Sequence, residues 1–271
     1  MRFFRSCTIK KIMVAFAAAI GSILLLMCMA DRYLLSRIAD RTEGGPLVVA
    51  AANGDIARVK TLLKEVGFDV RGEVGRRALR AAATGGHLEV VRLLVDKGAD
   101  VNVGIPRMGL PLTVAAFRGH LEVVRLLIEK GADLNPKPLV VARDSLTGTP
   151  VVDRDPLTAA AGRGHLEIAK LLIERGANFN PEVRTFLALS EATKGGYLEI
   201  VRLLINNGAD VNARSPRSQP PLLEAAARGY LEIVKLLLAS GADIEVQDTN
   251  HFTALLYATQ EGYKDMVELL L

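Results

Sequence analysis

The sequence predicts an all-α fold, a solenoid of stacked helix–turn–helix units behind one N-terminal transmembrane or signal helix. Two observations predict the stack: a segment of about 33 residues recurs along the chain, and the second half of each copy is apolar on nearly every side. A helix that apolar must pack between neighbours, so no unit closes its own core and stacking is obligatory. An uncharged run near the N-terminus predicts the membrane or signal helix.

That run covers residues 12–30 and would span about 28 Å as a helix, close to the thickness of the bilayer hydrocarbon. Four basic residues and no acidic residue precede it: Arg2, Arg5, Lys10 and Lys11. This charge favours a cytoplasmic N-terminus, which places the repeats on the non-cytoplasmic side of a single-pass protein. The segment Cys28-Met29-Ala30 also resembles a cleavage site, so a secreted or periplasmic protein released from a signal peptide stays open as an alternative.

The net charge of +4 belongs to this leader rather than to the repeats. Residues 1–45 hold seven of the 34 Lys and Arg residues and three of the 30 Asp and Glu residues, which leaves 27 of each for the remaining chain. A neutral body lacks the long-range field that attracts nucleic acid, so we expect no nucleic-acid partner. Both cysteines, Cys7 and Cys28, also lie in the leader, and the body offers no thiolate metal site.

The repeat is clearest in its second half. Two full copies are GGHLEVVRLLVDKGADVN (85–102) and RGHLEVVRLLIEKGADLN (118–135), and divergent copies occupy 53–70 and 261–271. One glycine aligns in all copies, with spacings of 32, 33, 45, 32, 33 and 33 residues: Gly54, Gly86, Gly119, Gly164, Gly196, Gly229 and Gly262. We therefore assign residues 1–30 to the anchor or signal, 31–45 to a linker and 46–271 to seven repeats, with these bounds: 46–74, 75–107, 108–135, 156–185, 186–218, 219–250 and 251–271, and an insertion at 136–155.

Each element of the unit has a local cause. Proline is common in the first turn of a helix, where its missing N–H is not needed. It marks the start of the first helix in four repeats: Pro46, Pro111, Pro156 and Pro221. Alanine pairs then let two helices approach closely: Ala82-Ala83, Ala115-Ala116, Ala160-Ala161 and Ala225-Ala226. The aligned glycine turns the chain into the second helix, and a further glycine is expected to end that helix in a left-handed cap: Gly98, Gly131, Gly176, Gly208 and Gly241.

These residues resemble the ankyrin repeat family, whose units read roughly T-P-L-H-x-A-A-x-x-G-H-L-E-V-V-x-L-L-L-x-x-G-A-D-V-N. The resemblance covers about residues 46 to 271 and implies an L-shaped stack that binds proteins on a concave face formed by the first helices, without transforming them. The T-P-L-H opening is reduced in three units, which we expect to start their first helix less sharply: Ala78-Leu79-Arg80, Ala188-Leu189-Ser190 and Ala254-Leu255-Leu256.

No pattern in the sequence indicates catalysis, a cofactor or a small-molecule substrate. His87, His120 and His165 occupy one repeat position at which Tyr197 and Tyr230 substitute. A metal ligand or a catalytic base could not be exchanged for tyrosine and keep one role, so we interpret these histidines as structural. Neither a nucleophile paired with a base nor a phosphate-binding glycine loop after a strand is present in the sequence. We therefore expect a protein that is not an enzyme and that holds neither cofactor nor metal.

A binding surface is better supported. In the resembled family the two residues after the alanine pair face the concave groove, and here four consecutive repeats place a basic residue there: Arg118, Arg163, Lys194 and Arg228. Phe117 lies beside the first of them, and Arg214 and Arg217 extend the surface from the loop before the sixth repeat. We predict a protein partner with an acidic stretch along repeats three to six. The alternative is that arginine is simply common at this position in ankyrin repeats.

The insertion at 136–155 contains two short β-branched runs, Leu139–Ala142 and Pro150–Val152, on either side of Ser145-Leu146-Thr147-Gly148. This pattern predicts a lengthened β-hairpin, which is either a contact site or a tolerated surface insertion. The sequence ends at Leu271 inside a second helix, so we expect either a longer natural chain or an apolar end that meets a partner. The preferred function is a membrane-tethered interaction scaffold, and the alternatives are the secreted effector or protective factor and the targeting module of a longer enzyme.

Overall fold

The computed structural model describes residues 45–65, 70–102, 109–136, 140–143, 150–152, 155–177, 184–213 and 219–271. The predicted membrane segment at 12–30 and almost all of the linker lie outside these residues. Within them, no helix combines the length and the apolar character that crossing a bilayer requires.

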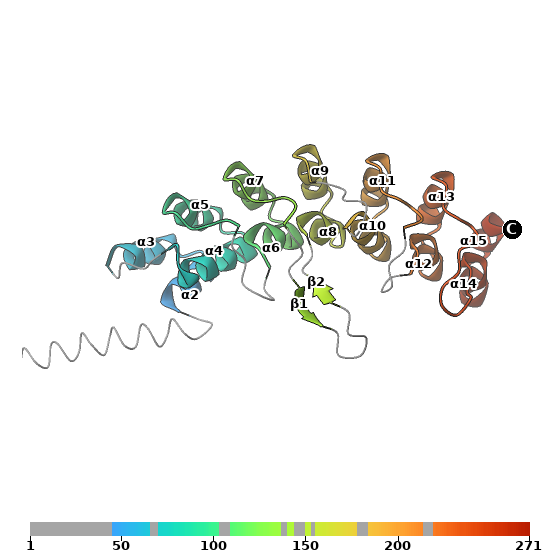
Figure 1. Cartoon of the computed structure of the whole chain (residues 1–271), viewed down its shortest axis with the longest axis horizontal. Coiled ribbons are helices and arrows are strands. Elements are labelled where there is room, and N and C mark those ends of the chain that lie inside the picture. The colour runs from blue at the N-terminus through green and yellow to red at the C-terminus, as the bar shows by residue number, and fades with distance from the viewer. Residues whose placement is uncertain are drawn as a thin grey trace, which may run out of the picture.

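The described residues form seven helix pairs stacked side by side in two rows (Figure 1). The inner helices are α2 (Pro46–Ala52), α4 (Glu73–Gly85), α6 (Pro111–Arg118), α8 (Pro156–Ala161), α10 (Arg184–Lys194), α12 (Pro221–Ala227) and α14 (Ala254–Glu261). The outer helices are α3 (Ile56–Glu65), α5 (Leu88–Asp96), α7 (Leu121–Glu129), α9 (Leu166–Glu174), α11 (Leu198–Asn206), α13 (Leu231–Ala239) and α15 (Lys264–Leu270). Each inner helix packs on the next inner helix and on its own outer helix. The predicted solenoid of helix pairs is therefore confirmed.

Four of the inner helices begin where the sequence places proline, and three, α4, α10 and α14, begin without it. Where proline is present, the preceding residue is extended, as at Leu110 and Asp155. Asp155 also caps α8, because its carboxylate accepts the Thr158 N–H at 2.9 Å. α4 and α10 lack this proline and begin at Glu73 and Arg184, two residues before the repeat boundaries at 75 and 186. Without the proline ring, nothing prevents the preceding residues from adopting helical angles.

The expectation of a less sharp start is wrong for α14. Thr253 keeps the threonine of the family opening, and its hydroxyl accepts the Leu256 N–H at 3.3 Å. A side-chain cap therefore fixes the first turn of α14 even though Ala254 replaces proline.

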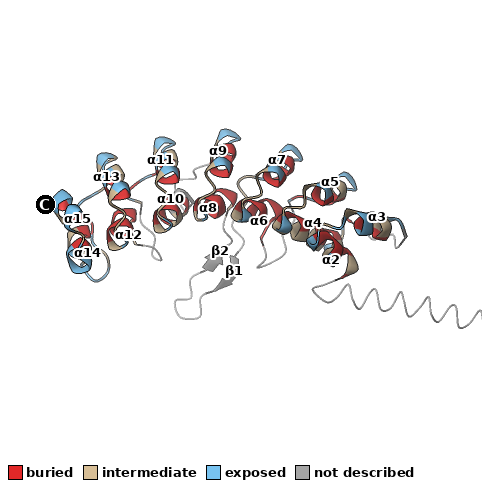
Figure 2. Cartoon of the chain, turned by 180° about the vertical axis from the view of Figure 1, so that it is seen from behind, coloured by how far each residue is buried: buried red, intermediate tan, exposed pale blue. Residues whose placement is uncertain are grey.

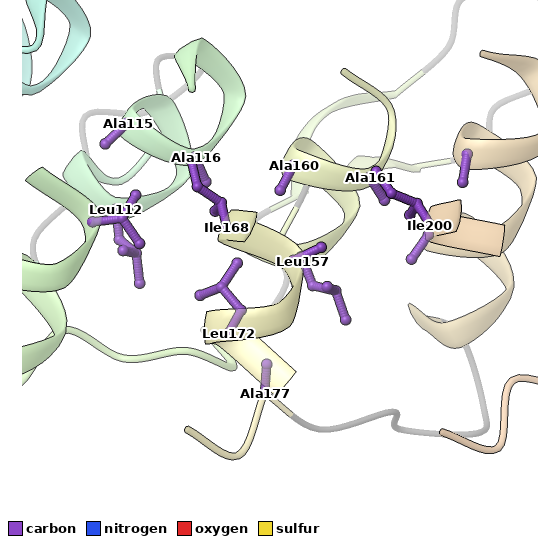
Figure 3. Packing of buried hydrophobic residues seen from close by; sticks show 14 of the residues in the cluster. Leu112, Ala115, Ala116, Leu157, Ala160, Ala161, Ile168, Leu172, Ala177 and Ile200 are labelled. Atoms are coloured by element: carbon purple, nitrogen blue, oxygen red, sulfur yellow. The ribbon is translucent and has the colours of Figure 1, made fainter. Parts of the chain in front are cut away.

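The alanine pairs of the inner helices are fully buried, as predicted. Figure 3 shows Ala160 and Ala161 of α8 between the neighbouring repeats, with Leu157 and Leu172 filling the layer beside them. Figure 2 shows the same arrangement along the whole stack, with buried residues on the helix sides that face their neighbours. Small side chains allow this close helix contact, and at the second position of the pair α10 buries Thr193 in place of alanine.

The outer helices carry the predicted narrow polar stripe. On α5, Glu89, Arg92 and Asp96 are exposed, while Val91 and Leu94 are completely buried. The predicted pairs Glu122–Arg125 and Glu199–Arg202 approach to 3.6 and 3.7 Å on the solvent side. Such exposed pairs contribute only a few tenths of a kcal/mol each. Burial, rather than these ion pairs, holds the outer row in place.

The turn glycines serve two purposes, of which the sequence reveals one. Gly54, Gly86 and Gly119 all have positive φ, between 71° and 83°, as the turn requires. In addition, the ring of His87, His120 or His165 from the following repeat lies over each glycine, where a Cβ atom would come within 2.6 Å of it. Tyr197, Tyr230 and Tyr263 lie over Gly164, Gly196 and Gly229 in the same way.

The histidines also bond across the junctions. Nε2 of His87, His120 and His165 lies 2.8, 3.0 and 3.2 Å from the carbonyl oxygens of Ala52, Thr84 and Phe117 in the preceding repeat. The histidines are therefore structural, as predicted. What the sequence did not show is that each one joins two repeats.

A second set of bonds crosses the junctions at the opposite edge. The Asn102 side chain donates to the Gly131 carbonyl at 2.9 Å and accepts the Asp133 N–H at 2.7 Å. Asn135 donates to Gly176 in the same manner, and Asn212 donates to Gly241. These glycines are three of the predicted left-handed caps, with φ between 83° and 88°. Each of these three caps therefore offers its carbonyl to the repeat before it.

The insertion forms the predicted hairpin. β1 (Val140–Arg143) and β2 (Pro150–Val152) pair antiparallel, within one residue of the predicted strands. The hairpin projects from the inner row, on the side away from the outer helices (Figure 1). The turn residues 145–148 lie outside the described part of the chain.

A polar network fixes the loop before α14. The Tyr257 hydroxyl donates to the Asp248 carboxylate at 2.7 Å and accepts from the Gln219 amide at 2.8 Å. The same carboxylate accepts the backbone N–H groups of Asn250 and Phe252. These bonds, led by the one from Tyr257, hold the pKa of Asp248 below its ordinary value of 3.8, and burial raises the pKa of Tyr257 above its ordinary value of 10.0.

This network predicts an acid-sensitive loop. Folding lowers the pKa of Asp248, so its ionised carboxylate stabilises the folded state. This stabilisation is complete above the unfolded-state pKa and is lost as pH falls through the folded-state pKa. Asp248→Asn should therefore reduce the loss of stability between pH 7 and pH 3, measured by urea unfolding at both values. Asp210→Asn, in a similar turn with Asn212, controls for replacing a turn aspartate. An unchanged pH dependence in Asp248→Asn would contradict the prediction.

Candidate functional site

Three of the predicted site residues meet at the centre of the inner row. Phe117 and Arg118 end α6, and Arg163 follows α8, so all three stand at the C-terminal ends of adjacent inner helices. Phe117 is half-buried and both arginines are exposed. The β1–β2 hairpin connects these two repeats and lies below the same helices (Figure 1). The chain therefore places an aromatic ring and two guanidinium groups at the adjacent ends of two inner helices, and the hairpin belongs to the loop between the same two repeats.

The geometry of this cluster is that of a stacked guanidinium. Arg163 Cζ lies 4.1 Å from the centroid of the Phe117 ring, and Arg118 Cζ lies 5.9 Å from it. Contact with the ring face restricts the Arg163 side chain and leaves the N–H groups on its edge available to solvent. Neither arginine makes an ion pair with any residue that the structure describes. A carboxylate of another molecule fits such a planar donor edge with two parallel hydrogen bonds.

The basic residues farther along the face are placed differently. Arg228 Nε donates to Glu224 Oε1 at 2.7 Å, and Lys194 Nζ lies 3.5 Å from Glu191 Oε1. Glu224 is only 7 % exposed, so the carboxylate holding Arg228 is largely shielded from water. These two cations are offset within their own repeats. Of the four predicted basic residues on this face, Arg118 and Arg163 in repeats three and four are thus the two without an ion pair among the described residues.

The two glutamates were not singled out from the sequence. Glu224 precedes Arg228 by four residues and Glu191 precedes Lys194 by three, which are the spacings at which side chains of one helix meet. That spacing was the available signal. Arg214 and Arg217, predicted to extend the surface, lie outside the described residues.

The described residues contain no group of three or more His, Cys, Asp or Glu side chains that could hold a metal ion. His87, His120 and His165 are engaged at the junctions between repeats. The chemistry that the inner face does offer is recognition, through one stacked aromatic–arginine cluster.

Comparison with known proteins agrees with the geometry. The family model described as "Ankyrin repeats (3 copies)" matches residues 47–138 and 141–215, and "Ankyrin repeats (many copies)" matches residues 222–271. Among solved structures, the chain is similar to the human ASB11 ankyrin repeat domain, with 28% sequence identity and a TM-score of 0.68. That alignment covers 83% of this chain and 97% of the ASB11 domain. The similarity thus extends over nearly all of the repeats rather than over one unit.

Proposed function

This chain belongs to the ankyrin repeat family, and on that premise we propose that it is a membrane-tethered, non-catalytic scaffold that holds a protein partner on its inner-helix face. Ankyrin repeat domains in general are interaction modules that bind proteins. The observation that supports a site on this face is the Phe117–Arg118–Arg163 cluster, where two guanidinium groups that have no ion pair within the described residues share one aromatic ring.

The partner that fits this cluster presents an acidic segment. Arg163 is already ordered against Phe117, so binding a carboxylate costs less side-chain entropy than it would for a freely rotating arginine. The hairpin in the loop between the same two repeats offers extended backbone, which suits a second contact with a partner that reaches across the inner row. In repeats five and six, which follow the site, the charges of Lys194 and Arg228 are already offset by Glu191 and Glu224.

The proposed site is tested by charge reversal. We expect Arg163→Glu to lower recovery of the partner at least about tenfold in a crosslinking pull-down of the full chain from native membranes, because it replaces attraction of an acidic segment with repulsion. Arg58→Glu is the matched control, since Arg58 is an exposed arginine on the outer helix α3. Partner recovery equal in the two variants would refute the site, and circular dichroism of both establishes that the repeats remain folded.

The tether is supported by the uncharged run at residues 12–30 and the basic residues before it. In this proposal the N-terminus is cytoplasmic and the repeats stand on the non-cytoplasmic side. Mass spectrometry of the mature N-terminus separates the tether from its alternative: an intact leader is expected, whereas a chain that begins at Asp31 would identify a secreted or periplasmic effector released after Ala30.

A further inference from the structure

A second charged site lies at the opposite edge of the stack, between the outer helices α3 and α5. A cavity of about 690 Å³ opens there, and its apolar side includes Leu63 and Leu93. Four cationic side chains line it: Lys60, Lys64, Arg71 and Lys97. The three lysines are exposed and make no ion pair within the described part of the chain.

The next junction of the same stack shows how unusual this cluster is. Between α5 and α7, Lys130 Nζ lies 2.8 Å from Asp96 Oδ1, and this bond holds the pKa of Asp96 below its ordinary value. Lys97 occupies the repeat position of Lys130, and Lys64 occupies that of Asp96. The first junction therefore sets lysine opposite lysine where the second has an ion pair.

Arg71 adds a further positive charge to the first junction. At the second junction the neutral Asn102 side chain reaches across to Gly131. At the first, the Arg71 side chain lies over the equivalent glycine, with Nε 3.2 Å from the position that a Cβ on Gly98 would occupy. Two departures from the repeat pattern thus bring positive charge to one cavity.

We propose that this cavity binds a phosphate-bearing anion. Like charges around one cavity repel each other, and a multivalent anion removes that repulsion by accepting hydrogen bonds from several ammonium groups at once. Lysine suits a phosphate because its three donors rotate to meet tetrahedral oxygens, whereas a planar carboxylate matches arginine better. The volume lies within the range of ligand pockets, and the apolar side accommodates the organic part of a phosphate ester.

The experiment uses the full chain in nonionic detergent and isothermal titration with two probes. The first is inorganic pyrophosphate, and the second is short-chain phosphatidylglycerol added to the micelles, with phosphatidylcholine as its neutral control. The central variant is Lys64→Asp, which restores the residue type of the second junction and so gives Lys97 a partner. Lys264→Asp, an exposed position on α15, is the charge-matched control.

We expect saturable binding by the wild type, at least about tenfold weaker binding by Lys64→Asp and unchanged binding by Lys264→Asp. The thermal unfolding midpoint of Lys64→Asp without ligand should not fall, because the substitution introduces an ion pair. Binding of both probes supports a site for free and lipid phosphate alike, and binding of phosphatidylglycerol alone identifies a lipid headgroup as the source. Absence of binding to both probes, or equal affinity in Lys64→Asp and wild type, overturns the proposal.

Discussion

Replacing Gly119 with alanine is expected to lower the free energy of unfolding by about 3 kcal/mol. Gly119 has a φ of 83°, which an L-residue adopts only with strain, and an added Cβ would lie 2.6 Å from His165 Cε1. The ring cannot retreat freely, because its Nε2 is bound to the Phe117 carbonyl at 3.2 Å. Backbone strain and overpacking therefore add at this position, and urea unfolding of the full chain measures their sum.

Replacing Gly131 with alanine distinguishes the cost of backbone strain from the cost of overpacking. Its φ is also 83°, but an added Cβ would meet no atom within 4 Å. Gly131→Ala should therefore cost only the strain, about 1 kcal/mol. In a His165→Ala background the cost of Gly119→Ala should fall to a similar value, since the clash is gone. Equal losses for Gly119→Ala and Gly131→Ala in the native background would show that the ring contact adds nothing.

Leu172→Ala is the second large effect, with an expected loss of about 3 kcal/mol. Leu172 has no solvent exposure, and it lies in the layer that Figure 3 shows together with Ile168 and Ala177. Because no repeat closes its own core, the cavity left by truncation would face two junctions at once. Denaturant unfolding followed by far-ultraviolet circular dichroism gives the change in stability.

The matched control for Leu172 is Leu256→Ala. Leu256 is 49 % exposed, so its truncation should change stability by less than about 1 kcal/mol. A loss at Leu256 as large as that at Leu172 would contradict the assignment of the core to the layers between repeats.

The features predicted well from the sequence are those decided within one repeat. Proline at Pro111 predicts the start of α6, and the glycine at Gly119 predicts the turn that ends it, because each acts on its own backbone angles. The hairpin strands were found for a similar reason, since their residue types favour extended backbone locally. The start of α4 at Glu73 was missed because no proline or capping side chain marks it in the sequence.

The features that the sequence did not reveal are contacts between repeats. His120 and Asn102 recur visibly, but recurrence does not say which neighbour a side chain reaches. The same limit applies to the binding face, where a row of basic residues looks uniform in the sequence. Only the structure separates Arg163, stacked on Phe117, from Arg228, bound to Glu224.

The hairpin lies in a loop whose neighbouring repeats are joined by bonds outside it. Asn135 precedes the insertion and still bonds to Gly176 at 3.1 Å, while Asp155, the last inserted residue, caps α8. Two bonds that join repeats three and four, Asn135 to Gly176 and His165 to Phe117, therefore lie outside the inserted residues. We therefore expect that residues between the two strands can be exchanged while these two bonds keep the repeats joined, which would let the molecule acquire a new specificity there.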